Sequence, residues 1–114
     1  MTDCLFCKMA TGAIPVKKEY EDDAMFAIED INPVAPIHIL IIPKLHVANV
    51  LELTPENDQL IGSVHRVAAE LARERGVAVD GFRLVNNTNA GAGQSVFHIH
   101  FHLLAGRKLN WPPG

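Results

Sequence analysis

The sequence lacks the features that direct a protein to a membrane or to nucleic acid. Its longest apolar run, Ile37 to Pro43, is far too short to cross a bilayer. The N-terminus has no basic segment followed by a hydrophobic one, which a secretory signal would need. No basic cluster exceeds the pair Lys17 and Lys18, and the formal net charge is -3 at pH 7. We therefore expect a cytoplasmic protein that binds neither membranes nor nucleic acid.

Cysteine is equally scarce, with only two residues in the motif Cys4-x-x-Cys7. Two cysteines are too few for a disulfide framework, and they fit a reducing compartment. From the spacing alone, both metal binding and simple apolar packing stay open for this pair.

The 114 residues are enough for one hydrophobic core, so we expect a single domain over residues 1–114. Thr54 and Pro55 are typical of a helix start, and apolar residues then recur at helical spacing until Gly76. A short helix is expected between a cap at Asp3 and a stop at Gly12. The strands expected are two within residues 16–30, joined by a turn at 21–23, and one each in 37–42, 82–87 and 97–103. This order predicts an α+β fold, with one long and one short helix on a five-stranded antiparallel sheet.

The last of these strands carries half of the six histidines, at His98, His100 and His102. Large apolar residues occupy the alternate positions Phe97, Ile99, Phe101 and Leu103. This two-residue period predicts a strand that turns its apolar side chains to the core and all three imidazoles to the other face.

Three interpretations of the histidine row compete. Exposed structural histidines need no explanation singly, but three in register are unusual. Neighbouring imidazoles can share a zinc ion, although the outer two are too far apart for one ion to bind all three. Nucleotidyl or phosphoryl transfer is the third interpretation, and it alone also uses the loop "NAGAGQS". There, amides around Gly93, Gln94 and Ser95 would form an anion-binding nest, and an imidazole would attack phosphorus. His100 is the preferred nucleophile because it is central, flanked by imidazoles that could bond the phosphate oxygens or orient its ring. The chemistry requires a backbone carbonyl on one ring nitrogen, which leaves the other directed at the substrate.

The motif "HIHFHLL" resembles the signature of the histidine triad (HIT) superfamily. The segments "EDDAMFAIEDINPVAPIHILIIPKLH" and "NAGAGQSVFHIHFHLLAGRK", with the terminal "NWPPG", are similar to its Hint branch. That branch hydrolyses purine nucleoside phosphoramidates and aminoacyl adenylates through a nucleotidyl-histidine intermediate, releasing AMP or GMP. The resemblance implies a HIT-like fold, a homodimer whose sheets join into one of ten strands, and no cofactor for catalysis.

Residue by residue, the resemblance implies that His100 becomes nucleotidylated while His102 and Ser95 contact the phosphate. Asn87, Gly93 and Gln94 would line the same site, and His38 would back the central imidazole. The pair expected to bind ribose is Asp30 and Ile31. The residues that match the purine pocket are Leu5, Phe6, Met9, Ile14 and Ile28, the last replacing an aromatic residue common in the family.

Bacterial relatives of this branch carry a Cys-x-x-Cys pair that joins two histidines around structural zinc. The matching positions are Cys4, Cys7, His46 and His98, and a metal at His98 would remove that imidazole from substrate binding. Two other functions stay open. One is hydrolysis of dinucleoside polyphosphates, as in the related Fhit branch, and the other is nucleotide sensing or scaffolding with incidental hydrolysis.

Overall fold

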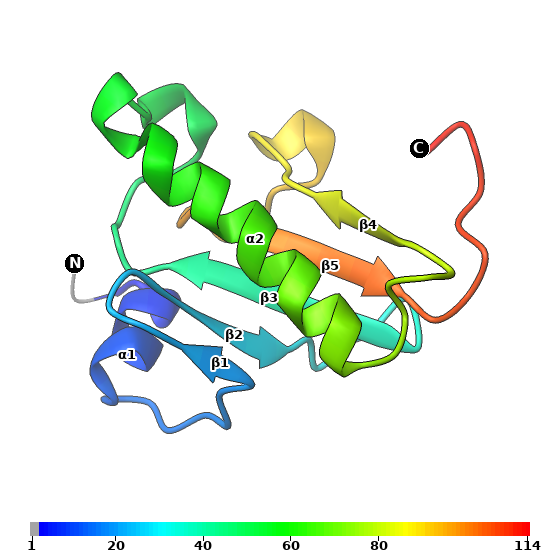
Figure 1. Cartoon of the computed structure of the whole chain (residues 1–114). Coiled ribbons are helices and arrows are strands. Elements are labelled where there is room, and N and C mark those ends of the chain that lie inside the picture. The colour runs from blue at the N-terminus through cyan, green and yellow to red at the C-terminus, as the bar shows by residue number, and fades with distance from the viewer. Residues whose placement is uncertain (1–2) are drawn as a thin grey trace.

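Five strands form one antiparallel sheet in the order β1-β2-β3-β5-β4 (Figure 1). The computed structural model describes residues 3–114. The strands are β1 (Tyr20–Glu21), β2 (Met25–Glu29), β3 (Ile37–Pro43), β4 (Phe82–Val85) and β5 (Phe101–Ala105). The expected α+β fold with a five-stranded antiparallel sheet is confirmed.

Two α-helices accompany the sheet, α1 (Leu5–Thr11) and α2 (Asp58–Glu74). Thr54 and Pro55 open a 3₁₀ turn over Pro55–Asn57, so the long helix begins three residues later than the cap motif predicts. The cap of α1 is Cys4, not Asp3, because the Cys4 thiolate or thiol sulfur accepts the N–H of Cys7 at 3.3 Å. Among the described residues, no helix combines the length and apolar character that a bilayer span requires.

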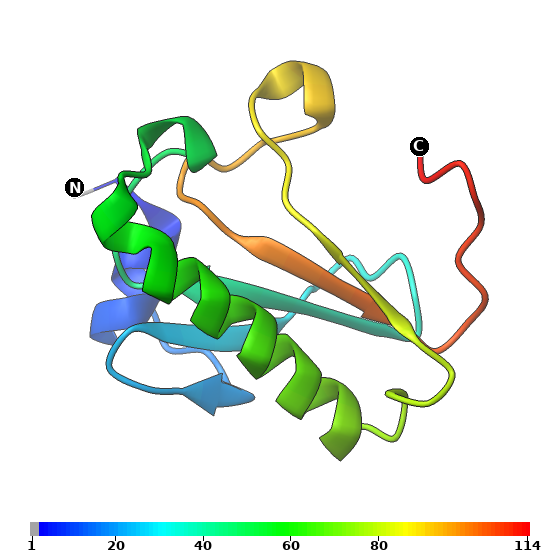
Figure 2. The same cartoon turned by 45° about the horizontal axis from the view of Figure 1, so that its top comes forward.

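Helix α2 lies across one face of the sheet (Figures 1 and 2). Its apolar stripe, which includes Val64, Val67 and Leu71, is buried against the side chains of β3 and β5 that point to this face. Those sheet residues are Ile39, Ile41, Phe101 and Leu103. Burial of this stripe gives the helix most of its stability, because helices in proteins depend on packing more than on propensity.

The opposite face of the sheet carries a second apolar cluster built on Phe6 of α1. Phe26, Ile28, Leu40 and Ile42 pack there because they alternate with the residues that face α2. His38 shares the parity of Leu40 on β3, and Leu40 pairs with His102 on β5. Two histidines from distant parts of the sequence therefore lie on the same face of the sheet as α1.

The predicted strand over residues 97–103 is correct only in its second half. β5 begins at Phe101, and His98 and His100 lie in an irregular segment before it. Phe97, expected in the core, is 48% exposed, whereas His98 is fully buried. The His98 ring tolerates burial because its Nε2 donates to the carbonyl oxygen of Pro43 at 2.7 Å, and this bond overrides the alternating pattern.

Candidate active site

His100 is held with one ring nitrogen bonded, while the other has no hydrogen-bond partner among residues 3–114. Its Nδ1 lies 2.8 Å from the carbonyl oxygen of His98. A carbonyl only accepts, so Nδ1 carries the ring proton and Nε2 keeps its lone pair. The ring of Phe6 meets the His100 ring edge-on, with centroids 5.2 Å apart. This contact fixes the plane of the imidazole, and no pattern in the sequence pointed to it.

His102 is the last member of a chain of hydrogen bonds that begins at the backbone N–H of Val34 and passes through His38. The N–H of Val34 donates to Nδ1 of His38 at 3.1 Å, so the proton of a neutral His38 is on Nε2. That Nε2 lies 2.8 Å from Nδ1 of His102 and 3.3 Å from Oδ2 of Asp30. A neutral His102 that accepts at Nδ1 must carry its own proton on Nε2. His38 therefore bonds His102 and not the central imidazole, which corrects the position expected for it.

Burial, followed by the charges of His100 and His38, lowers the pKa of His102 to about 4, and Asp30 opposes this shift. His102 is thus neutral near pH 7. It can donate one hydrogen bond from Nε2 without adding a positive charge beside His100.

The glycine-containing loop before the histidines contributes less to an anion nest than its sequence suggests. The N–H groups of Gly93 and Gln94 donate to the carbonyls of Ala90 and Asn89 within the loop. Gly93 has φ +97°, a conformation that residues with a side chain rarely adopt. The amide of Asn87 lies beside it, since a Cβ at Gly93 would sit 3.9 Å from the Asn87 nitrogen. Exposed Ser95 follows this turn.

Gln94 turns inward and organises the loop. Its Oε1 accepts from the N–H of Asn89 and from the amide of Asn49, at 2.7 and 3.2 Å. Its Nε2 donates to the carbonyls of Ala48 and Val96, at 2.7 and 3.1 Å. With four bonds made and the side chain buried, Gln94 holds the loop in place, and its amide is not directed at a ligand.

Two hollows are lined by residues expected at the site, and one of them includes histidines. One, of about 220 Å³, is lined by His38, His102 and Asn87 together with Val34, Val85 and Leu104. The other, of about 270 Å³, is lined by Met9, Val16, Ile28, Ile31, Lys17, Glu19 and Glu29. The second brings together three residues expected at the nucleoside, Met9, Ile28 and Ile31. Lys17, Glu19 and Glu29 were not expected there, because charged residues just before β1 and at the end of β2 carry no signal of their own.

The other residues expected to contact the nucleoside do not line this hollow and lie in different surroundings. Phe6 is buried in the cluster behind Ile28, and Ile14 is half-buried. Leu5 lines a separate hollow beside Ser95 and Phe97. Asp30 is half-buried at the end of β2, where its Oδ1 accepts the N–H of Asn32 at 2.8 Å and its Oδ2 faces His38. Asp30 therefore stabilises the turn after β2 and also contacts His38.

Four nitrogen and sulfur atoms converge where α1 meets the segment before β5. Cys4 Sγ and His98 Nδ1 are 3.3 Å apart, as are Cys7 Sγ and His46 Nδ1, and the two Nδ1 atoms are 3.0 Å apart. Donor separations of this size and an S₂N₂ set suit a tetrahedral zinc ion. The bond from His98 Nε2 to Pro43 directs the Nδ1 lone pair at the cluster, and burial lowers the pKa of His98, which keeps it neutral. The residues therefore fit a closed structural metal site.

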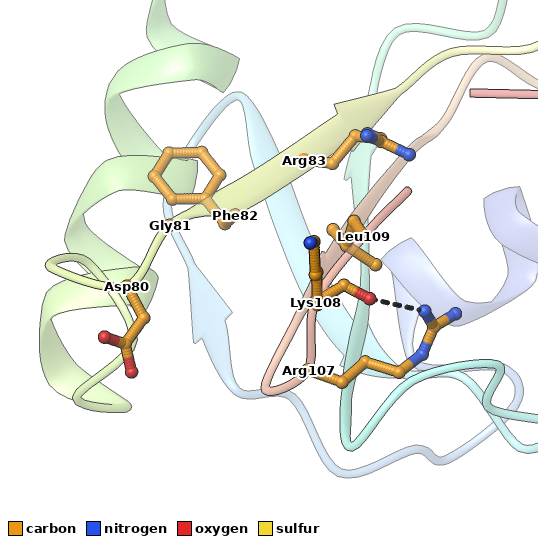
Figure 3. Close-up of a pocket in the computed structure, with 7 residues that line it drawn as sticks. All are labelled: Asp80, Gly81, Phe82, Arg83, Arg107, Lys108 and Leu109. Carbon is orange, nitrogen blue, oxygen red and sulfur yellow. Dashed lines mark hydrogen bonds between the residues drawn. The ribbon is translucent and has the colours of Figure 1, made fainter. Parts of the chain in front are cut away.

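A further hollow lies away from the histidines, between β4 and the segment after β5 (Figure 3). It is lined by Asp80, Gly81, Phe82, Arg83, Arg107, Lys108 and Leu109. Arg107 donates to the carbonyls of Lys108 and Val34, and Arg83 donates to that of Asn110. Arg83 therefore ties the C-terminal segment to β4, and Arg107 ties it to the loop before β3.

The fold and the histidine cluster together define a class: an antiparallel α+β domain with an oriented imidazole, at His100, and a hollow lined by two further histidines. The model of the HIT domain family matches residues 11–109, and the chain belongs to this family.

Similarity to known relatives extends over almost the whole chain. Purine nucleoside phosphoramidase from Escherichia coli is 45% identical over 107 residues, covering 94% of this chain and 90% of that protein. An uncharacterised HIT-like protein from Synechococcus elongatus is 45% identical over 112 residues, 98% of this chain and 97% of its own length. The crystal structure of a HIT family hydrolase from Legionella pneumophila superposes with a TM-score of 0.95 at 46% identity, covering 98% of this chain and 100% of the other. These relatives support a hydrolase.

Proposed function

We propose that the protein hydrolyses the P–N bond of purine nucleoside phosphoramidates, and the mixed anhydride of aminoacyl adenylates, to release AMP or GMP. The observation that carries the proposal is the orientation of His100, whose Nδ1–H is bonded to the His98 carbonyl while Nε2 is free. The similarity to the phosphoramidase from E. coli supports the choice of substrate.

In the first step, Nε2 of His100 attacks phosphorus, a P–N bond to histidine forms, and the P–N bond to the amine breaks. The amine takes a proton from solvent as it leaves, and the water that attacks in the second step returns one. In an aminoacyl adenylate the P–O bond breaks instead, and the carboxylate leaves without a proton. In the second step, water attacks phosphorus and releases the nucleotide, and the histidine recovers its lone pair. Neutral His102 donates its Nε2 proton to a phosphate oxygen, as does the Ser95 hydroxyl. Both bonds strengthen as charge develops on that oxygen.

The nucleoside extends from the histidines toward α1. The Asp30 carboxylate accepts bonds from the two ribose hydroxyls, and Ile31 packs on the sugar. The base enters the hollow lined by Met9, Val16 and Ile28. Asn87 and the Gly93 turn lie on the phosphate side, near His102.

Cys4, Cys7, His46 and His98 would hold a zinc ion. When bound, the metal would crosslink α1 to the segment before β5 and so fix the position of His98. The chemical step uses imidazole and needs no metal.

We further propose that the chain, as a single domain over residues 1–114, works in the cytoplasm as a homodimer. β4 is an edge strand, and Phe82 at its start is 38% exposed. Pairing of two such edges would give the ten-stranded sheet and would protect an edge that otherwise favours aggregation.

The test compares turnover of an adenosine phosphoramidate with that of a diadenosine polyphosphate by the purified protein. We expect the phosphoramidate to have the higher kcat/KM. A reversed order would assign the protein to dinucleoside polyphosphate hydrolysis. Tight AMP binding with negligible turnover of either substrate would instead indicate a sensing role.

A further inference from the structure

The hollow beside Ile28 has an apolar wall and a charged rim. Met9, Val16, Ile28 and Ile31 form the wall, on which an aromatic base can lie flat. The rim contains one cation, Lys17, and two carboxylates, Glu19 and Glu29. An apolar pocket accepts any base, so discrimination between bases depends on the polar groups at the rim.

Glu19 is the fixed member of this rim. Its side chain is only 14% exposed, and its Oε1 accepts a bond from Nη2 of Arg75 at 2.6 Å. Arg75 follows α2 and also reaches Oε2 of Glu29, at 3.4 Å, so one guanidinium anchors both carboxylates. The second oxygen of Glu19, Oε2, lies 3.9 Å from Nζ of Lys17. The Glu19 carboxylate, an acceptor, and the Lys17 ammonium, a cationic donor, therefore lie next to each other at the hollow.

We propose that Lys17 and Glu19 select a 6-oxopurine over adenine. This inference rests on the proposed function, since it assumes that the base occupies this hollow. Guanine and hypoxanthine present a carbonyl oxygen, O6, next to a donor, N1–H. The Lys17 ammonium matches O6, and Oε2 of Glu19 accepts from N1–H, with the guanine N2 amino group adding a second donor.

Adenine has the opposite polarity at the same two positions. Its N6 amino group would face the Lys17 ammonium, and its unprotonated N1 would face the Glu19 carboxylate. Both contacts would place like partners together, donor against donor and acceptor against acceptor, which is how a site built for one hydrogen-bonding pattern rejects another.

Calorimetric binding of GMP, IMP and AMP tests this inference without relying on turnover. We expect GMP to bind the wild-type protein about tenfold more tightly than AMP, since a hydrogen bond to a charged group contributes on this scale. IMP, which keeps O6 and N1–H but lacks the amino group, should lie between them. Glu19→Gln should bring the ratio of the GMP and AMP dissociation constants close to one.

Two further variants keep the test interpretable. Lys17→Met removes a side chain that is 89% exposed, so it should leave the fold intact and reduce the preference on its own. Glu74→Gln, at the end of α2 and outside the hollow, is the matched control and should leave the preference unchanged. Equal GMP and AMP affinities in the wild type, or a preference that survives Glu19→Gln and Lys17→Met, would overturn the inference while leaving the proposed hydrolysis intact. Failure of all three nucleotides to bind would count against both.

Discussion

The main-chain carbonyl of His98 accepts a hydrogen bond from Nδ1 of His100 at 2.8 Å, while the His98 ring points into the cysteine cluster. One residue thus orients the proposed nucleophile with its backbone and contributes a candidate metal ligand with its side chain. Any change that displaces the His98 ring will also move the carbonyl that sets the tautomer of His100.

Replacement of the nucleophile should separate binding from chemistry. In His100→Ala, turnover of an adenosine phosphoramidate should fall by at least about 10³-fold, because the covalent intermediate cannot form. AMP affinity, measured by calorimetry, should change by less than about tenfold, since ribose and base contacts remain. His65→Ala, at an exposed position on α2, is the control. A His100→Ala protein with near-normal turnover would remove the mechanism.

Loss of a cysteine from the cluster should affect both stability and rate. Cys7→Ala should bind less than one equivalent of zinc, and its Tm should fall by about 5 °C or more, since each kcal/mol lost shifts Tm by roughly 4 °C. We expect kcat to fall more than nucleotide affinity, because the His98 carbonyl loses its fixed position. Metal analysis and thermal unfolding, with and without a chelator, measure these effects. Unchanged zinc content and Tm would show that the cysteines are simple packing residues.

Stability should decrease on acidification because His102 resists protonation in the folded state. Its pKa is about 4 in the protein against an ordinary 6.5. Between these values the unfolded chain binds a proton that the folded chain does not, so the free energy of unfolding falls as the pH drops from 6.5 to 4. The loss attributable to His102 is at most about 3 kcal/mol.

Urea unfolding at pH 7 and pH 4.5 measures this effect in the wild type and in His102→Asn. The variant should lose less stability between the two pH values, and His65→Asn should behave like the wild type. Equal losses in the wild type and His102→Asn would mean that other groups govern the acid sensitivity.

Gln94 offers a test of the loop that carries Ser95. Gln94→Glu would place a carboxylate oxygen against the carbonyls of Ala48 and Val96, which now accept bonds from Nε2. We expect a loss of about 2 to 4 kcal/mol in the free energy of unfolding, and a smaller loss for Gln94→Met, which introduces no charge. A Gln94→Glu protein as stable as Gln94→Met would contradict the four-bond role of this amide.

Several features could be predicted from local patterns alone. The alternation along β3 and the helical spacing in α2 are repeated many times, so each apolar face is specified redundantly. The triad and its preceding glycine loop likewise led to His100 as the proposed nucleophile, and its Nδ1 bonds a backbone carbonyl as that proposal expects.

Features that depend on a single long-range contact were missed or misplaced. The irregular segment at His98 and His100 depends on Pro43 and on the cysteines, and the edge-on ring of Phe6 comes from a helix 94 residues before His100 in the chain. His38 meets His102 because of the strand register. The register pairs His38 with Leu104 and Leu40 with His102, so His38 and His102 are diagonal neighbours on one face of the sheet.

The sequence by itself determined the residue types and the faces of the regular elements, because these follow from side-chain chemistry and local periodicity, and it suggested a histidine as the nucleophile. Only the tertiary structure decided which imidazole meets which partner, that Gln94 turns inward, and that Lys17 and Glu19 border the hollow beside Ile28. Those relationships join segments far apart in the chain, and hydrogen bonding at separations of about 3 Å depends on packing that no local pattern encodes.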